Sequence, residues 1–142
     1  IQLAESFLFQ DSAKFMGWKI GNNGFEMMLS SELPKIILNS AAPRAKEILV
    51  QKGIDISAIK HWALHPGGRA ILDSLQNGLE LSDEQLKPSR EVLRNFGNLS
   101  SVSILFVLKN LLENVELKKD DYLCAIAFGP GLTMELVLFK VV

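Results

Sequence analysis

Two apolar segments near the C-terminus constrain the fold of this chain more than any other feature. Residues 122–128 (YLCAIAF) and 132–142 (LTMELVLFKVV) are apolar on both faces when they are read as strands, and a Gly-Pro-Gly turn joins them. Strands of this kind occur in sheets that are covered on both sides, usually by helices. The pattern therefore predicts a pair of strands at the centre of a layered sheet.

The rest of the chain predicts helices and further strands, in an order typical of an α/β domain. Strands are expected at 3–9, 15–20 and 25–29, which would form an antiparallel meander, and at 60–65. Helices are expected at 34–52 with a kink at Pro43, at 70–78, at 88–96 after a capping box of Ser82 and Gln85, and at 100–114. The last of these is apolar nearly all round and is expected inside the protein. We expect one domain, residues 1–142, with a mixed sheet covered by helices.

The composition argues against several classes of function. The 142 residues carry 15 basic and 16 acidic side chains, so their net charge of −1 creates no field that would attract nucleic acid or an anionic membrane. No apolar run, residues 104–108 and 122–128 included, approaches the roughly 20 residues that span a bilayer. A single cysteine fits a reducing compartment, so a cytoplasmic location is expected. No spacing of ligand residues indicates a metal site.

The first candidate site is the stretch HPGG, residues 65–68, which lies between a predicted strand and a predicted helix. Ligands bind at such positions in open α/β sheets, because strand ends and helix N-termini meet there. Gly67 and Gly68 lack side chains and let backbone amides approach a ligand closely. The alternative is a tight turn in which His65 bonds to a nearby carbonyl.

Two other turns are candidates of the same kind. Gly97 permits a left-handed turn, and Asn98 after it either caps the following helix or offers N–H donors to a ligand, with capping the simpler explanation. The turn from Phe128 to Gly131 is explained by hairpin geometry alone, although such a turn can also form a pocket wall. Cys124, with His65 and Asn98, would complete a Cys-His-Asn nucleophilic set, but its apolar strand indicates an inert core residue.

Taken together, these stretches resemble the C-terminal half of the chalcone and stilbene synthases, which are type III polyketide synthases. The segments that carry the resemblance are GWKIGNNGFEMMLSSELP (17–34), HPGG (65–68), ILD (71–73), PSREVLRNFGNLSS (88–101) and FGPGLTMEL (128–136). They occur in the family's order and spacing and cover essentially the whole chain. The resemblance implies a thiolase-like fold, in which two similar halves pack into a five-layered sandwich and this chain is one half.

The resemblance also implies roles for individual residues. His65 and Asn98 match the histidine and asparagine that bind the thioester carbonyl and assist the decarboxylation of malonyl-CoA. Gly67 and Gly68 lie where the family's backbone passes the CoA arm, and Met27 lies near a gatekeeper position. The loop that shapes the cyclisation pocket matches Phe128, Gly129, Pro130 and Gly131.

The family's nucleophilic cysteine lies in the N-terminal half, and Cys124 does not match it. The chain begins with Ile1 and has no counterpart of that half, so we expect a piece of an acyltransferase about twice as long that is inactive by itself. Its expected partners are its own N-terminal half, a second copy in a homodimer or other self-association, and the substrates acyl-CoA and malonyl-CoA. The resemblance implies no cofactor beyond these CoA thioesters.

Three alternatives stay open at this point. A ketoacyl synthase III-like condensing enzyme of fatty acid synthesis uses the same residue set, but with a different sequence around the histidine. A non-catalytic thiolase-fold domain would lack the nucleophile, and a self-contained cysteine hydrolase would use Cys124. The sequence departs from common family residues at Arg69, Leu99 and Ala127, changes that alter pocket size and starter choice more readily than reaction type.

Overall fold

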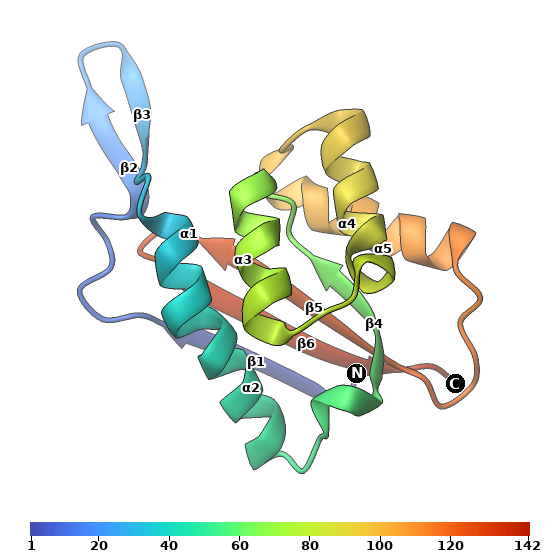
Figure 1. Ribbon diagram of the computed structural model, residues 1–142. Coiled ribbons are helices and arrows are strands. Elements are labelled where there is room, and N and C mark those ends of the chain that lie inside the picture. Colours follow the sequence, from blue (N-terminus) through green and yellow to red (C-terminus); the bar gives the residue numbers. More distant parts are fainter.

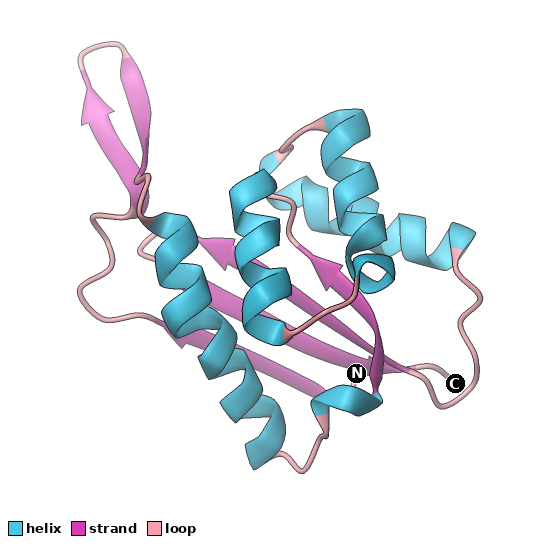
Figure 2. Ribbon diagram, viewed as in Figure 1, coloured by secondary structure: helices cyan, strands magenta, loops and turns pink.

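The computed structural model describes residues 1–142 and is built on a four-stranded mixed sheet in the order β1-β6-β5-β4 (Figures 1 and 2). The strands are β1 (Leu3–Leu8), β4 (Ile59–Leu64), β5 (Tyr122–Gly129) and β6 (Thr133–Lys140). β4 runs parallel to β5, and β6 runs antiparallel to both β5 and β1. The two C-terminal strands therefore occupy the centre of the sheet, which confirms the prediction from their apolar pattern.

The helices lie where the sequence predicts them, with two differences. They are α1 (Leu33–Ile36), α2 (Ala42–Gln51), α3 (Arg69–Leu79), α4 (Asp83–Phe96) and α5 (Ser103–Asn114). A π-helical turn, Ile37–Ala41, joins α1 to α2, so the helical run does not break at Pro43, and its irregularity lies in the turn just before that residue. Pro43 lies in the first turn of α2, where its missing N–H costs least. None of these helices combines the length and hydrophobicity that a bilayer crossing demands.

The second difference concerns α4. The capping box of Ser82 and Gln85 is present, but it begins one continuous helix at Asp83 that passes through Pro88, so the expected short helix at 88–96 is too short. The reciprocal cap satisfies backbone donors of the first turn, and an apolar face carrying Leu86 and Val92 packs inward. Together these interactions outweigh the local cost of a proline.

One face of the sheet carries the main core. Helices α1, α2 and α3 cover it, as the view in Figure 1 shows, and their apolar side chains pack against inward residues of all four strands. Trp62, Ile126 and Leu136 form the sheet's side of this core and are fully buried. Helices α2 and α3 approach closely, since a Cβ placed on Gly78 would come within 2.4 Å of the Ala42 Cβ. A glycine at this position permits that spacing.

The opposite face of the sheet is only partly covered. Val107 and Leu111 of α5 pack on Ala63, Leu123 and Ala125 of β4 and β5. On the same helix Leu105 and Leu112 are 60% and 68% exposed, so the expectation that this segment lies wholly inside is wrong for this chain. Towards β1 the same sheet face is bare, with Ala4, Ser6 and Leu8 exposed. Coverage on both sides is thus confirmed for β4 and β5, and in part for β6, where Val137 and Phe139 are half-buried against the same cluster.

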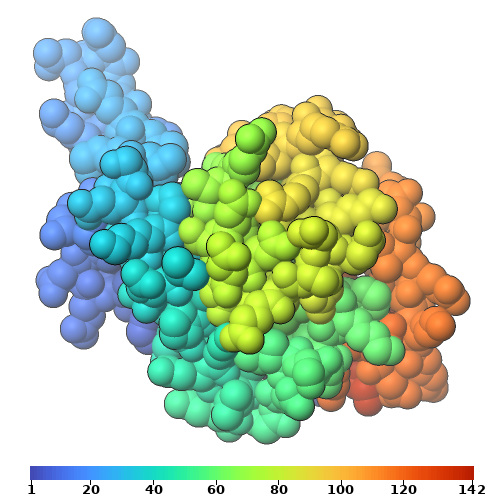
Figure 3. All heavy atoms as spheres, in the orientation of Figure 1, coloured from blue at the N-terminus to red at the C-terminus, as the bar shows by residue number.

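The strands β2 (Met16–Gly21) and β3 (Gly24–Leu29) form a separate two-stranded hairpin. It projects from the body of the molecule, as the space-filling view in Figure 3 shows. The predicted meander is therefore wrong, because β1 pairs with β6 rather than with β2. The expected turn between Gly21 and Gly24 is present. Every residue of β3 is exposed, including the apolar ones.

Candidate functional site

A cavity of about 480 Å³ lies where β4 and β5 end, between the β2–β3 hairpin and the start of α5. His65 and Asn98 both line it, and so do Met27, Phe128, Gly129 and Pro130. The structure therefore brings six of the nine residues singled out in the sequence to one place. Gly67, Gly68 and Gly131 lie outside the lining. Ala127, which the sequence marks as a departure from the family, lines it too. The sequence did not indicate the other lining residues, which are Met16, Trp18, Ser100, Ser101, Ile104, Thr133 and Glu135.

His65 is the first residue after β4. Its backbone N–H donates to the Ile126 carbonyl at 2.9 Å, which extends the β4–β5 pairing by one residue and fixes the start of the turn. The residue is only 8% exposed, and burial lowers the pKa of its imidazole below the ordinary 6.5. At neutral pH the ring is therefore uncharged, with one N–H donor and one acceptor nitrogen.

The His65 ring forms no hydrogen bond inside the chain, and burial is the one cause that shifts its pKa. The simpler explanation from the sequence, a turn histidine bonded to a carbonyl, predicts such a bond. Its absence leaves both ring nitrogens free for a molecule in the cavity. This observation favours the binding role for His65.

Gly67 connects the histidine to the asparagine. Its N–H donates to the His65 carbonyl at 2.9 Å, and its carbonyl accepts a hydrogen bond from Asn98 Nδ2 at 3.1 Å. Gly68 precedes the first residue of α3, and a Cβ added there would meet no atom within 4 Å. That the CoA arm passes these glycines stays a prediction.

Asn98 follows Gly97, whose φ of 72° ends α4 with the left-handed turn that the sequence predicts. Its Oδ1 accepts a hydrogen bond from the Ser100 N–H at 2.9 Å, at the start of a short 3-10 turn, Ser100–Val102. No side chain caps α5 itself, so the simpler capping role holds only for that preceding turn. One N–H of the Asn98 amide is left over after these two bonds.

The turn after β5 forms one wall of the cavity. Gly131 has a φ of 83°, and its N–H donates to the Met16 carbonyl at 2.7 Å. Ser12 Oγ lies 2.6 Å from the Gly131 carbonyl, so the segment leading into the hairpin is tied to this turn. The hairpin adds Met16, Trp18 and Met27 to the lining. Trp18 pairs directly with Met27 across the hairpin, so the two side chains lie on the same face. The alternation of side chains along the two strands is therefore the signal from which Trp18 could have been predicted.

Cys124 has no access to this cavity. It is fully buried in β5, and burial raises the pKa of its thiol far above the ordinary range. A thiol in that environment does not form the thiolate that nucleophilic catalysis requires. The hypothesis of a self-contained cysteine hydrolase is therefore not supported.

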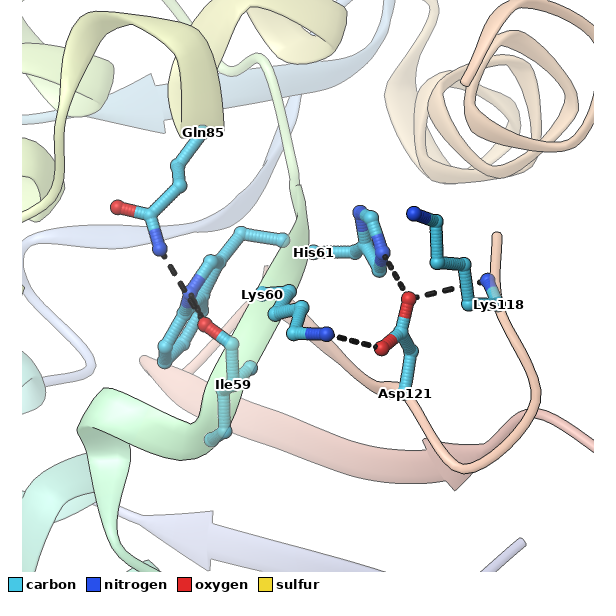
Figure 4. A network of polar contacts seen from close by, with 7 residues as sticks. Ile59, Lys60, His61, Gln85, Lys118 and Asp121 are labelled. Atoms are coloured by element: carbon cyan, nitrogen blue, oxygen red, sulfur yellow. Dashed lines mark hydrogen bonds and ion pairs between the residues drawn. The ribbon is translucent and has the colours of Figure 1, made fainter. Parts of the chain in front are cut away.

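A second polar cluster lies away from the cavity, around Asp121 (Figure 4). Its carboxylate accepts hydrogen bonds from Lys60 Nζ at 2.6 Å, His61 Nε2 at 3.2 Å and the Lys118 N–H at 3.0 Å. These contacts tie β4 to the connection that precedes β5. A wider hollow of about 720 Å³ lies beside this cluster, lined mostly by polar side chains of both charges that indicate no single ligand. No group of three potential metal ligands occurs in the structure.

Comparisons with known proteins agree on one family. The model of the chalcone and stilbene synthases, C-terminal domain, matches residues 1–142. The alpha-pyrone synthesis polyketide synthase-like Pks18 of Mycobacterium tuberculosis is 40% identical over 124 residues, which are 87% of this chain and 32% of that protein. Type III polyketide synthase B of Arabidopsis thaliana is 35% identical over 138 residues, 92% of this chain and 35% of that protein.

Solved structures give the same result. The 1,3,6,8-tetrahydroxynaphthalene synthase of Streptomyces coelicolor superposes with a TM-score of 0.92 at 27% identity, over 99% of this chain and 40% of that one. PKS-I of the brown alga Ectocarpus siliculosus gives 0.87 at 31% identity, over 98% and 38%. The chain spans about a third of the length of its curated relatives. With its thiolase-like fold and a match from its first residue to its last, this chain belongs to the chalcone and stilbene synthase family of type III polyketide synthases.

Proposed function

We propose that the full-length enzyme is an acyltransferase that condenses malonyl-CoA onto an acyl-CoA starter, and that this chain supplies His65 and Asn98 to the reaction. The observation that carries the proposal is the shared cavity, which a buried imidazole and an anchored carboxamide both line. The named relatives include an alpha-pyrone polyketide synthase-like protein and a tetrahydroxynaphthalene synthase, which fits this class of reaction.

The chemistry suits these two side chains. When the malonyl thioester loses carbon dioxide, the electrons of the broken C–C bond move onto the thioester oxygen and form an enolate. The neutral His65 ring and the remaining Asn98 N–H each provide a donor for that oxygen. Donors fixed before the reaction stabilise the charge as it develops, and removing one typically costs about 3 to 4 kcal/mol of transition-state stabilisation. The enolate carbon then attacks the acyl carbon of the starter thioester, so that a C–C bond forms, the C–S bond breaks and the thiolate that held the acyl group leaves.

The walls of the cavity would select the acyl chain. Met27 and Trp18 from the hairpin, Phe128 from the end of β5 and Pro130 from the turn after it give it an apolar lining. We assign Met27 the gatekeeper role, and residues 128–131 the role of shaping the space in which the chain cyclises. Gly67 and Gly68 at the start of α3 would lie along the CoA arm. No cofactor other than the CoA thioesters, and no metal, enters this proposal.

The nucleophile must come from outside this chain, since Cys124 is buried and away from the cavity. Two surfaces fit the N-terminal half that would carry it. Leu105 and Leu112 form an exposed apolar stripe on α5, and the hairpin exposes Ile20 and Phe25 at 80% and 74%. Exposed apolar surface of this extent marks contact sites in soluble proteins. The chain alone is expected to be inactive, and a homodimer of the full-length enzyme is part of the proposal.

The test is an assay of the full-length enzyme with acyl-CoA and malonyl-CoA in the absence of acyl carrier protein. Extended products and release of carbon dioxide support the proposal. Strict dependence on carrier protein would instead indicate a ketoacyl synthase III-like enzyme. An upstream half without a cysteine at the nucleophile position would indicate a non-catalytic domain. A cytoplasmic location, where CoA thioesters occur, and the absence of nucleic-acid and membrane partners complete the proposal.

A further inference from the structure

The amide of Asn98 is held from both ends by backbone groups. Its Nδ2 donates to the Gly67 carbonyl at 3.1 Å, and its Oδ1 accepts from the Ser100 N–H at 2.9 Å. One partner requires a donor and the other requires an acceptor. Only a carboxamide satisfies both partners. In an aspartate, an oxygen with no hydrogen to donate would face the Gly67 carbonyl oxygen. The orientation of the amide is therefore defined by its surroundings.

The backbone around Asn98 is shaped to make these contacts. Ser100 has a φ of 57°, the left-handed region that a residue with a side chain seldom adopts and that costs about 1 kcal/mol or more. In this conformation its N–H points back at the Asn98 side chain. The Leu99 N–H donates to the buried Ser103 Oγ at 2.7 Å. This bond ties Leu99, which lies between Asn98 and Ser100, to the first turn of α5. The strained residue thus follows a hydrogen-bonded neighbour, Leu99, and itself donates to Asn98.

Gly67 makes the second contact and also joins the amide to the histidine. Its N–H closes a three-residue turn onto the His65 carbonyl at 2.9 Å, while its own carbonyl accepts from Asn98. A single peptide segment therefore fixes the turn that presents the imidazole and the direction of the carboxamide. Its backbone shows no positive φ, and a Cβ added there would make only ordinary contacts, the nearest at 3.4 Å from the His65 ring. What matters at this position is therefore the backbone N–H and carbonyl.

We infer that Gly67 and Ser100 are positioning residues, whose carbonyl and N–H respectively turn the free N–H of Asn98 towards the cavity that it shares with His65. Neither backbone group needs to touch the substrate. This inference rests on the proposed function, because it concerns the donor that the reaction would use. It adds a reason, independent of the chemistry, why an amide stands at position 98.

The experiment is an amide-to-ester substitution at Ser100 in the full-length enzyme, in which oxygen replaces the N–H and the side chain is kept. We expect kcat for malonyl-CoA decarboxylation to fall about tenfold with KM unchanged, less than the roughly 100- to 1000-fold loss expected for removing the donor itself. The control is the same ester at Gly53, which removes an N–H bonded to the Val50 carbonyl at the end of α2 and leaves kcat as it was.

A second background separates positioning from damage to the fold. In an Asn98→Ala enzyme there is no amide to orient, so the Ser100 ester should lower the residual rate no further. An equal fall in both backgrounds, or no fall in the Asn98 enzyme, overturns the inference. An unmodified enzyme without decarboxylase activity overturns the proposed function instead. In that case a crystal structure of the ester variant tests the inference separately. The Asn98 amide should lose its contact with the Gly67 carbonyl, and an amide in an unchanged position overturns the inference.

Discussion

Leu64 and Ser89 join the strand that ends at the cavity to the helix that leads to Asn98. The Leu64 N–H, on the outer edge of β4, donates to Ser89 Oγ at 3.0 Å, and both residues are fully buried. β4 has no neighbouring strand on this side, so the α4 hydroxyl takes the place of a strand partner. His65 follows directly after Leu64. The relative placement of the two site residues thus depends on packing between β4 and α4.

Ser89→Ala should therefore destabilise the protein. It leaves a buried backbone N–H without a partner, which costs about 1 to 3 kcal/mol. Ser40→Ala, at an exposed serine of the π-helical turn, is the matched control and should change little. Differential scanning calorimetry of the full-length variants measures the difference in Tm. Equal Tm values for the two variants would show that the Leu64 N–H finds another partner.

The stability of the folded protein should depend on pH because His65 is buried. Its pKa in the folded protein is lowered below 6.5, so the unfolded chain binds the proton more readily. Stability should therefore fall as the pH drops below about 6.5, and level off once the folded-state pKa is passed. His65→Gln should remove this component of the slope. Thermal unfolding between pH 5 and 8 tests it, and a slope unchanged in the variant contradicts it.

Much of this site could be predicted from the sequence because its parts are local. A histidine followed by proline and two glycines marks the end of a strand, and Gly97 marks the end of a helix, whatever the rest of the chain does. The pairing of β5 with β6 follows from their short connection. The pairing of β1 with β6 could not be predicted from the sequence, because β6 lies at the other end of the chain and an apolar strand pattern does not specify a distant partner.

The exposure of α5 shows a second limit of the sequence. Apolar residues all round a helix indicate that both sides will be covered, and one side of α5 does pack on the sheet. The other side carries Leu105 and Leu112 and has no cover within these residues. A hydrophobic pattern reports that a partner surface exists, but it does not report whether that surface belongs to the same segment.

Gly78→Ala should destabilise the protein although alanine is the better helix former. The propensity gain of about 1 kcal/mol is smaller than the roughly 1 to 3 kcal/mol cost of overpacking, because the new methyl would meet the Ala42 Cβ at 2.4 Å. Asn77→Ala, at the exposed neighbouring position of α3, keeps the propensity gain without the clash. A Tm that falls for the first variant and holds or rises for the second confirms the close approach of α2 and α3.

Asp121 should contribute more to stability than its neighbour Asp120. Lys60, the Lys118 N–H and His61 all hold the pKa of the Asp121 carboxyl well below its usual value of 3.8, whereas Asp120 is exposed and pairs only with Lys140. Asp121→Asn should therefore lower Tm at neutral pH more than Asp120→Asn does. The folded-state pKa is the lower one, so this contribution is complete above about pH 5 and is lost as the pH falls below 3.8. A gap between wild type and Asp121→Asn that fails to narrow in acid would contradict this account.

Met27 offers a test of the cavity as the acyl-binding space. It lines the cavity, whereas Met28, the next residue of β3, points to the opposite face of the hairpin and does not. Met27→Ala should enlarge the space and raise the ratio of kcat/KM for a long-chain over a short-chain acyl-CoA starter by about tenfold, because each methylene that fits is worth about 1 to 3 kcal/mol. Met28→Ala removes the same atoms from the other face and should leave the ratio unchanged. The ratio is measured with the full-length enzyme across a series of acyl-CoA chain lengths. A similar shift in both variants would mean that the hairpin acts through its overall stability, and that Met27 is no gatekeeper.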